Sequence, residues 1–274
     1  MITGALTKMS NQLAADNRAH YQLLIGDQQI ALNPLLGQSL SLKFAGKIAC
    51  VGCGRVISKS FQQGYCFPCT QRLAACDLCI LKPELCHFAK GTCREPEWAL
   101  GHCMQPHYVY LANSSGLKVG ITRETNVPYR WIDQGATQAL LIAKTNSRYV
   151  SGLVEVMFKQ YVADKTNWRK MLQGDAEPLD LVMIRDQWLP QIMPAIDALR
   201  QQNQSAVIDL LPEQTPYQIH YPVLHYPNKV VSLDLAQMTE MSGVLHGIKA
   251  QYLLFDKGVI NVRKFSGYHV ELEV

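Results

Sequence analysis

The pattern of apolar and polar positions predicts short strands at both ends of the chain and in its middle. In these runs β-branched and aromatic residues predominate, and Gly, Asn, Asp, Pro and Ser separate one run from the next. The predicted strands cover residues 21–25, 39–44, 107–112, 117–122, 251–255, 259–263 and 268–274. The last three are close enough in sequence to form a meander of neighbouring antiparallel strands. We expect the N-terminal strands to join this C-terminal sheet, because neither end supplies many strands alone.

Three other stretches have the spacing of amphipathic helices. Residues 128–134 predict a short helix, and residues 151–163 predict a longer one with a broad apolar face. Residues 181–202 predict a third helix, which Pro190 and Pro194 are expected to interrupt or bend.

These elements divide the chain into four segments and predict an α+β fold. We expect an N-terminal β segment at 1–48, a cysteine-rich zinc-binding block at 49–104, a small mixed α/β module at 105–172, and a helix followed by a C-terminal β domain at 173–274. The N- and C-terminal segments together would form the β-rich part. The cysteine-rich block has few long apolar runs, so we expect it to need metal ions in order to fold.

Composition indicates a folded chain with no membrane span. Hydrophobic residues make up 48% of the 274 residues and charged residues 18%. The chain lacks a run of about eighteen apolar residues, the length that a membrane helix needs. Residues 1–20 also lack the apolar core of a signal peptide. We therefore expect a cytoplasmic protein, and in a reducing compartment clustered cysteines are more often metal ligands than disulfides.

Two CxxC pairs predict one zinc site. The pairs are Cys50-Val-Gly-Cys53 and Cys66-Phe-Pro-Cys69, with twelve residues between them. Each pair presents two thiolates to one tetrahedral ion, and the intervening hairpin lets the second pair complete the site. Four thiolates leave no open position for water, so this zinc is expected to stabilise the fold rather than to take part in a reaction.

A second group of cysteines and histidines predicts a second structural zinc. Its simplest four ligands are Cys76, Cys79, Cys86 and Cys93. Spacing alone leaves further candidates open, namely Cys103, His87, His102 and His107. Two other arrangements also stay open. Cys50 and Cys53 would share an ion with the pair at 76–79 in a cross-brace, or the second group would hold an iron–sulfur centre, whose ligands are also thiolates.

The segment after the cysteines carries several short motifs in a fixed order. They are Tyr108-Val109-Tyr110, Lys118-Val119-Gly120-Ile121-Thr122, Arg130, Glu155 and Asn167. In order and spacing, residues 107–170 resemble the GIY-YIG endonuclease superfamily. In that superfamily two strands with the name motifs precede a helix with an arginine and a later helix with a glutamate. The resemblance implies a small module that cleaves DNA or RNA with the help of a divalent cation.

The resemblance also implies a role for each matched residue. Glu155 would hold Mg²⁺, Arg130 would neutralise charge on the phosphate, and Tyr110 would help to activate water. Lys118 stands where the superfamily usually has a tyrosine; there it would bind phosphate or act as a base, or it would mark a relative that only binds. Residues expected to contact nucleic acid are Tyr108, Arg123 and Asn167.

Charge favours a polyanionic partner without distinguishing an enzyme from a binding protein. Basic side chains outnumber acidic ones in residues 43–94 and 105–172, whereas the reverse holds in 173–274. The alternative to a nuclease is a non-catalytic, zinc-containing module that binds nucleic acid or another protein. The two hypotheses differ in whether the four proposed catalytic side chains converge on one pocket. The sequence does not predict the oligomeric state.

Overall fold

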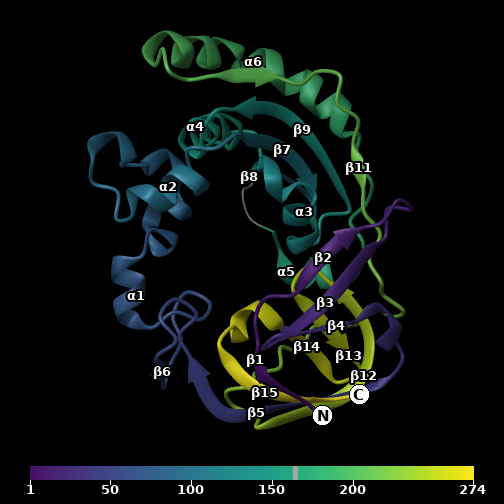
Figure 1. The fold of residues 1–274 in the computed structure, drawn as a ribbon. Coiled ribbons are helices and arrows are strands. Elements are labelled where there is room, and N and C mark those ends of the chain that lie inside the picture. Colours follow the sequence, from purple (N-terminus) through teal and green to yellow (C-terminus); the bar gives the residue numbers. More distant parts are fainter. Residues whose placement is uncertain (163–165) are drawn as a thin grey trace.

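The fold is α+β and is built on three antiparallel sheets (Figure 1). It is seen in a computed structural model that describes residues 1–162 and 166–274. The largest sheet joins the two ends of the chain in the order β1-β15-β5-β12-β13-β14, and β6 pairs with β5. Its strands are β1 (Ile2–Ala5), β5 (Ser39–Ala49), β6 (Val56–Ile57), β12 (Glu240–Lys249), β13 (Tyr252–Phe255), β14 (Gly258–Asn261) and β15 (Tyr268–Glu273). The expected union of N- and C-terminal strands is therefore confirmed.

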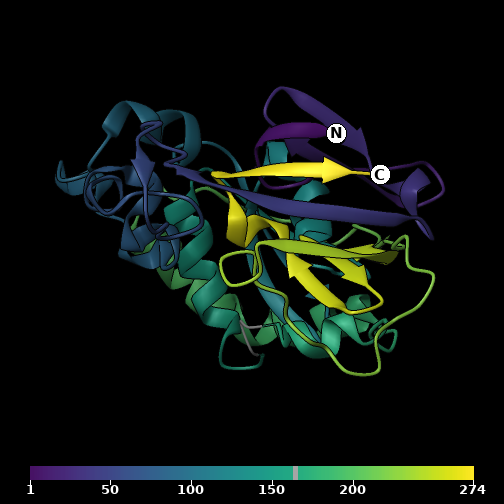
Figure 2. The same cartoon turned by 90° about the horizontal axis from the view of Figure 1, so that it is seen from below.

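The predicted C-terminal meander is correct only for its first two strands. β13 and β14 form a hairpin, but β15 pairs with β5 on one side and β1 on the other, with Val270 opposite Phe44. The reason lies in the 3₁₀ helix Val262–Phe265, which follows β14 and buries Val262 and Phe265. That turn carries the chain across the sheet, so β5 and β12 lie between β15 and the hairpin (Figure 2).

The second sheet carries the predicted module and has the order β10-β9-β7-β8, with β11 also paired to β9. Its strands are β7 (His107–Asn113), β8 (Leu117–Arg123), β9 (Gln138–Thr145), β10 (Ile208–Leu210) and β11 (Tyr217–Gln218). The short helix α3 (Tyr129–Asp133) lies between β8 and β9 in sequence, and α4 (Arg148–Phe158) follows β9. Residues 208–218, which we expected in the C-terminal part, thus complete the sheet of the module.

The remaining elements cover these sheets. A three-stranded sheet contains β2 (Ser10–Leu13), β3 (Ala19–Ile25) and β4 (Gln28–Ala31), and the other helices are α1 (Phe67–Arg72), α2 (Pro96–His102), α5 (Trp168–Leu172) and α6 (Leu181–Gln202). Helix α6 continues through Pro190 and Pro194, so the expected interruption is wrong. The predicted helix at 151–163 begins earlier, at Arg148, where the Ser147 side chain accepts a hydrogen bond from Val150 N–H. It also ends earlier than predicted, at Phe158, and the predicted last residue, Ala163, lies outside the described residues.

The module sheet has a hydrophobic core on each face. One core unites it with the large sheet, and there Trp131 is fully buried, its ring 5.8 Å from Tyr110 and 4.7 Å from Tyr217. The other core packs β7, β8 and β9 against α4 and α6. None of the described helices has both the length and the apolar character of a membrane span.

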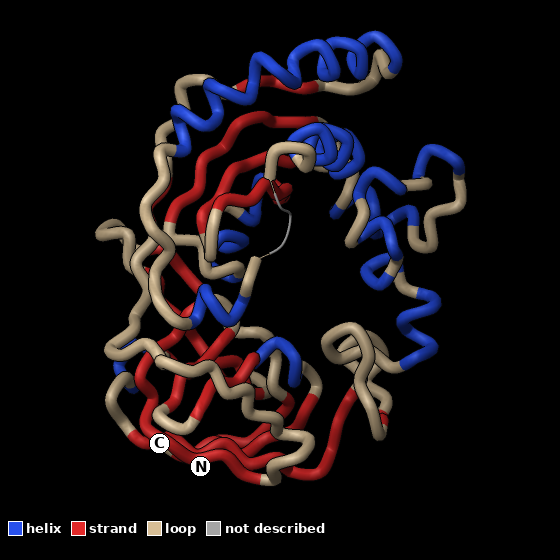
Figure 3. Tube along the Cα trace, turned by 180° about the vertical axis from the view of Figure 1, so that it is seen from behind, coloured by secondary structure: helices blue, strands red, loops and turns tan. Residues whose placement is uncertain are grey.

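The cysteine-rich block forms an arc from the end of β5 to the start of α4 (Figures 1 and 3). A 3₁₀ turn within it, Pro83–Leu85, packs on α4 at Gly152. A methyl group on Gly152 would overlap Pro83, so the absence of a side chain there permits the contact. The arc is thereby attached both to the large sheet and to the module.

Candidate functional site

The first four cysteines converge where β5 ends and α1 begins. The Sγ atoms of Cys50, Cys53, Cys66 and Cys69 all lie within 4.8 Å of one another, so the cluster can hold a metal ion. The sulfurs of Cys53 and Cys66 are 3.8 Å apart. That distance matches the separation of about 3.8 Å that a tetrahedron with metal–sulfur bonds of about 2.3 Å requires.

Backbone groups support the metal-binding form of Cys50. The N–H of Cys66 donates to Cys50 Sγ at 3.1 Å, and the N–H of Gly52 donates to it at 3.4 Å. Burial raises the pKa of the Cys50 thiol, but these N–H groups outweigh burial and lower the pKa to about 6. Since the thiolate is the form that binds metal, the loop prepares this ligand in advance.

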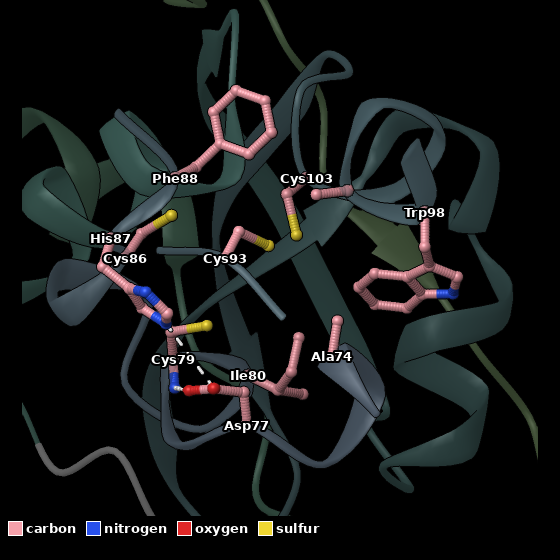
Figure 4. Close-up of a pocket in the computed structure, with 11 residues that line it drawn as sticks. Ala74, Asp77, Cys79, Ile80, Cys86, His87, Phe88, Cys93, Trp98 and Cys103 are labelled. Atoms are coloured by element: carbon pink, nitrogen blue, oxygen red, sulfur yellow. Dashed lines mark hydrogen bonds and ion pairs between the residues drawn. The ribbon is translucent and has the colours of Figure 1, made fainter. Parts of the chain in front are cut away.

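A small, partly open cavity, of about 10 Å³, lies further along the block and is lined by four other cysteines (Figure 4). The sulfur atoms of Cys79, Cys86, Cys93 and Cys103 face the same space. We call this the second cysteine cavity. Cys103, which sequence spacing left as an alternative, lies in the cavity.

Cys76 lies outside this cavity, although we had expected it in the second ligand set. It lines the neighbouring large cavity, and its thiol is buried. Burial raises the pKa of Cys76, and the cysteines that add to the increase are Cys50 and Cys66 of the first cluster. The cross-brace arrangement is also not formed, because Cys50 and Cys53 gather with Cys66 and Cys69 while Cys79 lines the second cavity.

Asp77 and His87 also line the second cysteine cavity, where their ligand atoms and that of Cys79 lie within 4.8 Å of one another, and both bond to other protein groups. Asp77 accepts a hydrogen bond from Cys79 N–H at 3.1 Å and pairs with Arg94 at 2.7 Å. The two ring nitrogens of His87 lie 3.5 Å from Asp77 Oδ2 and 2.8 Å from Thr92 Oγ1. These contacts orient the cysteine loop around Cys79.

A larger cavity, of about 330 Å³, separates the cysteine block from the module and is strongly basic. Four arginines line it, from four different parts of the chain: Arg123, Arg130, Arg148 and Arg263. His102 and His107 line it as well, and none of the described lining residues is Asp or Glu. We call it the arginine cavity. His107, an alternative metal ligand by sequence, instead faces this cavity, and its Nδ1 lies 2.7 Å from the Gln105 carbonyl oxygen.

The cations around the arginine cavity repel one another. Burial lowers the pKa of Arg148 and of Arg263, and the charge of Arg130 lowers both further. Burial also lowers the pKa of His107 to about 4, and Arg148 and Arg123 act in the same direction. In addition, the buried Nε of Arg148 has no partner within the described protein. An anion in this cavity would relieve the repulsion.

The four proposed catalytic residues interact with one another, and one of them, Arg130, lines this cavity. Tyr110 hydroxyl and Lys118 Nζ each donate to Gln134 Oε1, both at 2.8 Å, and Lys118 also donates to Thr166 at 3.0 Å. Burial, followed by the charge of Arg130, lowers the pKa of Lys118 to about 7, while the charge of Glu155 opposes them. Arg130 and Glu155 also influence the pKa of Tyr110, which burial raises.

Gln134 was missed by the sequence analysis. It follows α3 directly. Its side-chain oxygen Oε1 accepts hydrogen bonds from Tyr110 on β7 and from Lys118 on β8. The one signal available was its position four residues after Arg130, because residues four apart lie on one face of a helix. Its function depends on contacts between strands, which no motif records.

Glu155 is mostly buried, with 12% of its side chain exposed, and its Oε2 lies 3.9 Å from Lys159 Nζ. Mg²⁺ is typically held by one or two carboxylates, with water molecules and substrate phosphates completing its shell. A single glutamate that acts on the same residues as Arg130, which lines the basic cavity, fits that pattern.

The three residues expected to contact nucleic acid differ in their surroundings. Arg123 lines the arginine cavity. Tyr108 does not line it and donates to Glu124 at 2.8 Å. Asn167 accepts a hydrogen bond from Lys170 N–H as the N-cap of α5. Of the three, only Arg123 faces the basic space.

Comparisons with known proteins place the chain in a family but assign no function to these features. A family model described as "Protein of unknown function (DUF2797)" matches residues 37–270, which include the cysteine block and the whole module. No curated protein and no solved structure matches the chain.

Proposed function

Because the chain belongs to the DUF2797 family, whose description assigns no activity, we propose from its geometry that the protein binds a phosphate group of nucleic acid in the arginine cavity and hydrolyses a phosphodiester bond beside it. The observation that carries the proposal is the position of Arg130. This side chain lines the arginine cavity and also interacts with Tyr110 and Lys118. One guanidinium thus connects the anion-binding space with the group of titratable residues.

The arrangement of the module supports the proposal. β7 is the central strand between β8 and β9, α3 connects β8 to β9, and α4 follows with Glu155. This is the order of strands and helices that the resemblance to the GIY-YIG superfamily implies. A long-range charge pattern is consistent with it, since arginines from the module and from the C-terminal segment reach one cavity.

The chemistry follows from the protonation states of the residues. Lys118, with a pKa of about 7, is partly neutral near pH 7 and can accept a proton from water. Tyr110, whose pKa is raised, stays protonated, and its bond to Gln134 holds the hydroxyl in place. Arg130 would neutralise charge that develops on the phosphate. Mg²⁺, when bound at Glu155, would supply Lewis-acid stabilisation of the same charge.

The test compares cleavage by the wild-type chain with cleavage by Glu155→Gln. Purified protein is incubated with end-labelled single- and double-stranded DNA and RNA in Mg²⁺ or Mn²⁺. We expect cleavage by the wild type, loss of at least about a hundredfold in the variant, and no change in Glu213→Gln, an exposed matched control. Cleavage that persists in Glu155→Gln would exclude this mechanism.

A second candidate function is binding without catalysis, and the burial of two residues favours it. Tyr110 is 1% exposed and Lys118 is 4% exposed, so both would have to reach the substrate from within the fold. In this case the hydrogen bonds from Tyr110 and Lys118 to Gln134 stabilise the fold and take no part in a reaction. Salt-sensitive binding of nucleic acid without cleavage in any divalent cation would support this candidate over the first.

For the first cysteine cluster we propose zinc as the metal. The 3.8 Å separation of two of its sulfurs and the N–H bonds to Cys50 suit a closed four-thiolate zinc site. Elemental analysis of the purified chain, before and after substitution of Cys66 by Ser, tests this assignment.

A further inference from the structure

We propose that the nucleic acid bound in the arginine cavity is single-stranded, and that its unpaired bases occupy the large cleft next to that cavity. The inference rests on the proposed function, whose substrate it narrows to one class. The large cleft, of about 760 Å³, is lined on one side by the cysteine block and on the other by residues at 7–8 and 263–266.

The large cleft and the arginine cavity adjoin each other. Four residues line both of them: Ala75, Ile80, Leu81 and Arg263. Because Arg263 lines both spaces, a phosphate beside its guanidinium lies at their boundary. A ligand held in the arginine cavity can therefore continue into the cleft along the same protein surface.

The two spaces differ in charge. The arginine cavity has four arginines and no acidic side chain among its described lining residues. In the cleft, by contrast, Arg94 pairs with Asp77 at 2.7 Å, and Lys8 pairs with Asp133 at 3.2 Å. The cleft is therefore far less basic than the cavity. A nucleic acid strand is divided in the same way, because its phosphates are charged and its bases are not.

The walls of the cleft carry groups that can bind the edges of bases. Gln62, Gln63 and Gln71 line it, and a glutamine side chain both donates and accepts hydrogen bonds. Base edges carry the same mixture of donors and acceptors. Gln62 and Gln63 are exposed, and within the part of the chain that the structure describes neither side chain has a hydrogen-bond partner. Both amides are thus available to a ligand.

The turn that presents these two amides has an unfavourable backbone conformation. Gln62 and Gln63 have φ angles of 43° and 68°, in the left-handed region that favours glycine. They lie in a tight hairpin turn, in which the N–H of Tyr65 donates to the carbonyl oxygen of Phe61 at 2.9 Å and the N–H of Phe61 donates to that of Tyr65 at 2.8 Å. Such conformations are concentrated at binding sites.

The cleft also has apolar surface that suits the faces of bases. Leu78 and Leu81, which line it, are 54% and 78% exposed, although leucine is one of the residues most often buried. The ring of Tyr65 lines the cleft as well. Aromatic rings bind bases by stacking and tolerate any sequence, because every base has a flat face.

A double helix does not expose these parts of its bases. In a duplex the base faces stack on neighbouring pairs and the pairing edges are occupied, so only the groove edges remain open. Proteins that bind single strands combine a basic groove for the backbone with side chains on which bases stack. The arginine cavity and the large cleft provide these two parts side by side.

The first experiment compares three fluorescent ligands by anisotropy, without divalent cations so that no cleavage occurs. They are a short unstructured strand, the same strand fully paired in a hairpin, and an abasic strand with as many phosphates as the first, each as DNA and as RNA. We expect the unpaired strand to bind at least about tenfold more tightly than the other two. Equal affinity for the unpaired strand and for either of the others would overturn the proposal.

The second experiment tests the cleft itself. The double variant Gln63→Ala, Leu81→Ala removes two exposed side chains, so it should fold. It should bind the unpaired strand about tenfold more weakly and the abasic strand as the wild type does. The matched control Gln29→Ala, Leu100→Ala changes two exposed residues that line neither space, and it should bind both strands unchanged. Wild-type affinity of the first variant for the unpaired strand would refute the assignment of the bases to the cleft.

Failure of this inference can be told apart from failure of the proposed function. Selective binding of the unpaired strand, together with cleavage that persists in Glu155→Gln, would exclude the mechanism and leave the strand preference standing. Equal binding and cleavage of single-stranded and double-stranded substrates would exclude the preference and leave the nuclease function standing. Absence of binding to every ligand would exclude both.

Discussion

The backbone N–H of Arg148 donates a hydrogen bond to the carbonyl oxygen of Cys103 at 2.8 Å. Arg148 is the first residue of α4, the helix that carries Glu155, and Cys103 is the last cysteine of the block. The start of the helix is therefore attached to a candidate metal ligand. Cys103 also lines both the second cysteine cavity and the arginine cavity, so the two cavities share a wall.

We predict that loss of the metal from the first cysteine cluster unfolds the cysteine block, while the large sheet and the module sheet persist. One small cluster of buried residues in the block has Cys50, Cys66 and Cys69 at its centre. Structural zinc contributes about 10–16 kcal/mol, comparable with the whole stability of a typical domain. We expect Cys66→Ser to lose zinc and to be cleaved by protease within residues 49–104.

The control for this prediction is Cys76→Ser, which removes a buried thiol close to the first cluster but outside it. It should keep its zinc and resist the protease as the wild type does. Equal protection of the block in Cys66→Ser would show that apolar packing, and not the metal, holds it together.

If nucleic acid binds in the arginine cavity, removing one positive charge from the cavity should weaken that binding. Arg263 lines the cavity, and the nearby charge of Arg130 lowers its pKa. Replacing Arg263 by Gln should weaken binding of a short oligonucleotide about tenfold, and it should reduce the slope of log affinity against log salt by about 1. Fluorescence anisotropy at several salt concentrations measures both. Arg18→Gln, which changes an exposed arginine paired with Asp16, should leave both unchanged.

Lys118 predicts a pH dependence of stability. Burial lowers its pKa from 10.5 to about 7, so between these values the unfolded chain binds a proton that the folded chain does not. Stability should therefore rise with pH from about 7 to 10.5, by up to about 1.4 kcal/mol per pH unit from this group. The free energy of unfolding in urea should lack this rise with pH in Lys118→Met. It should keep the rise in Lys229→Met, which changes an exposed lysine.

The same lysine predicts the pH profile of any cleavage. If neutral Lys118 is the base, the rate should increase as pH rises through about 7 and then level off. A rate that falls over the same interval would indicate that the charged form acts, by binding phosphate.

Sequence patterns predicted the features that depend on local spacing. The strands β7 and β8 follow from two apolar runs around a polar turn, and the CxxC spacing brought Cys50, Cys53, Cys66 and Cys69 together. Strand β9 was not predicted because it is buried on both faces, so its residues show no alternation.

Other features depend on contacts between distant segments and have no local signal. β15 leaves the expected meander because β5, more than two hundred residues earlier, provides its partner. Spacing favoured Cys76 as a ligand and left Cys103 as an alternative, whereas the path of the arc places Cys103 in the second cysteine cavity and Cys76 outside it. Gln134 gains its role when strands β7 and β8 present Tyr110 and Lys118 to it.

The contact between the arc and the module predicts opposite effects for two helical glycines. A methyl group at Gly152 in α4 would overlap Pro83 of the cysteine block, whereas one at Gly101 in α2 would meet nothing within 4 Å. Alanine is the better helix former by about 0.5–1 kcal/mol, so Gly101→Ala should stabilise the protein slightly. At Gly152 the overlap should exceed that gain and destabilise the protein by about 1–3 kcal/mol. Urea unfolding measures both differences, and protease cleavage within residues 49–104 should increase in Gly152→Ala alone. Equal stabilisation by the two substitutions would mean that the arc does not press on α4 and that the cysteine block does not position Glu155.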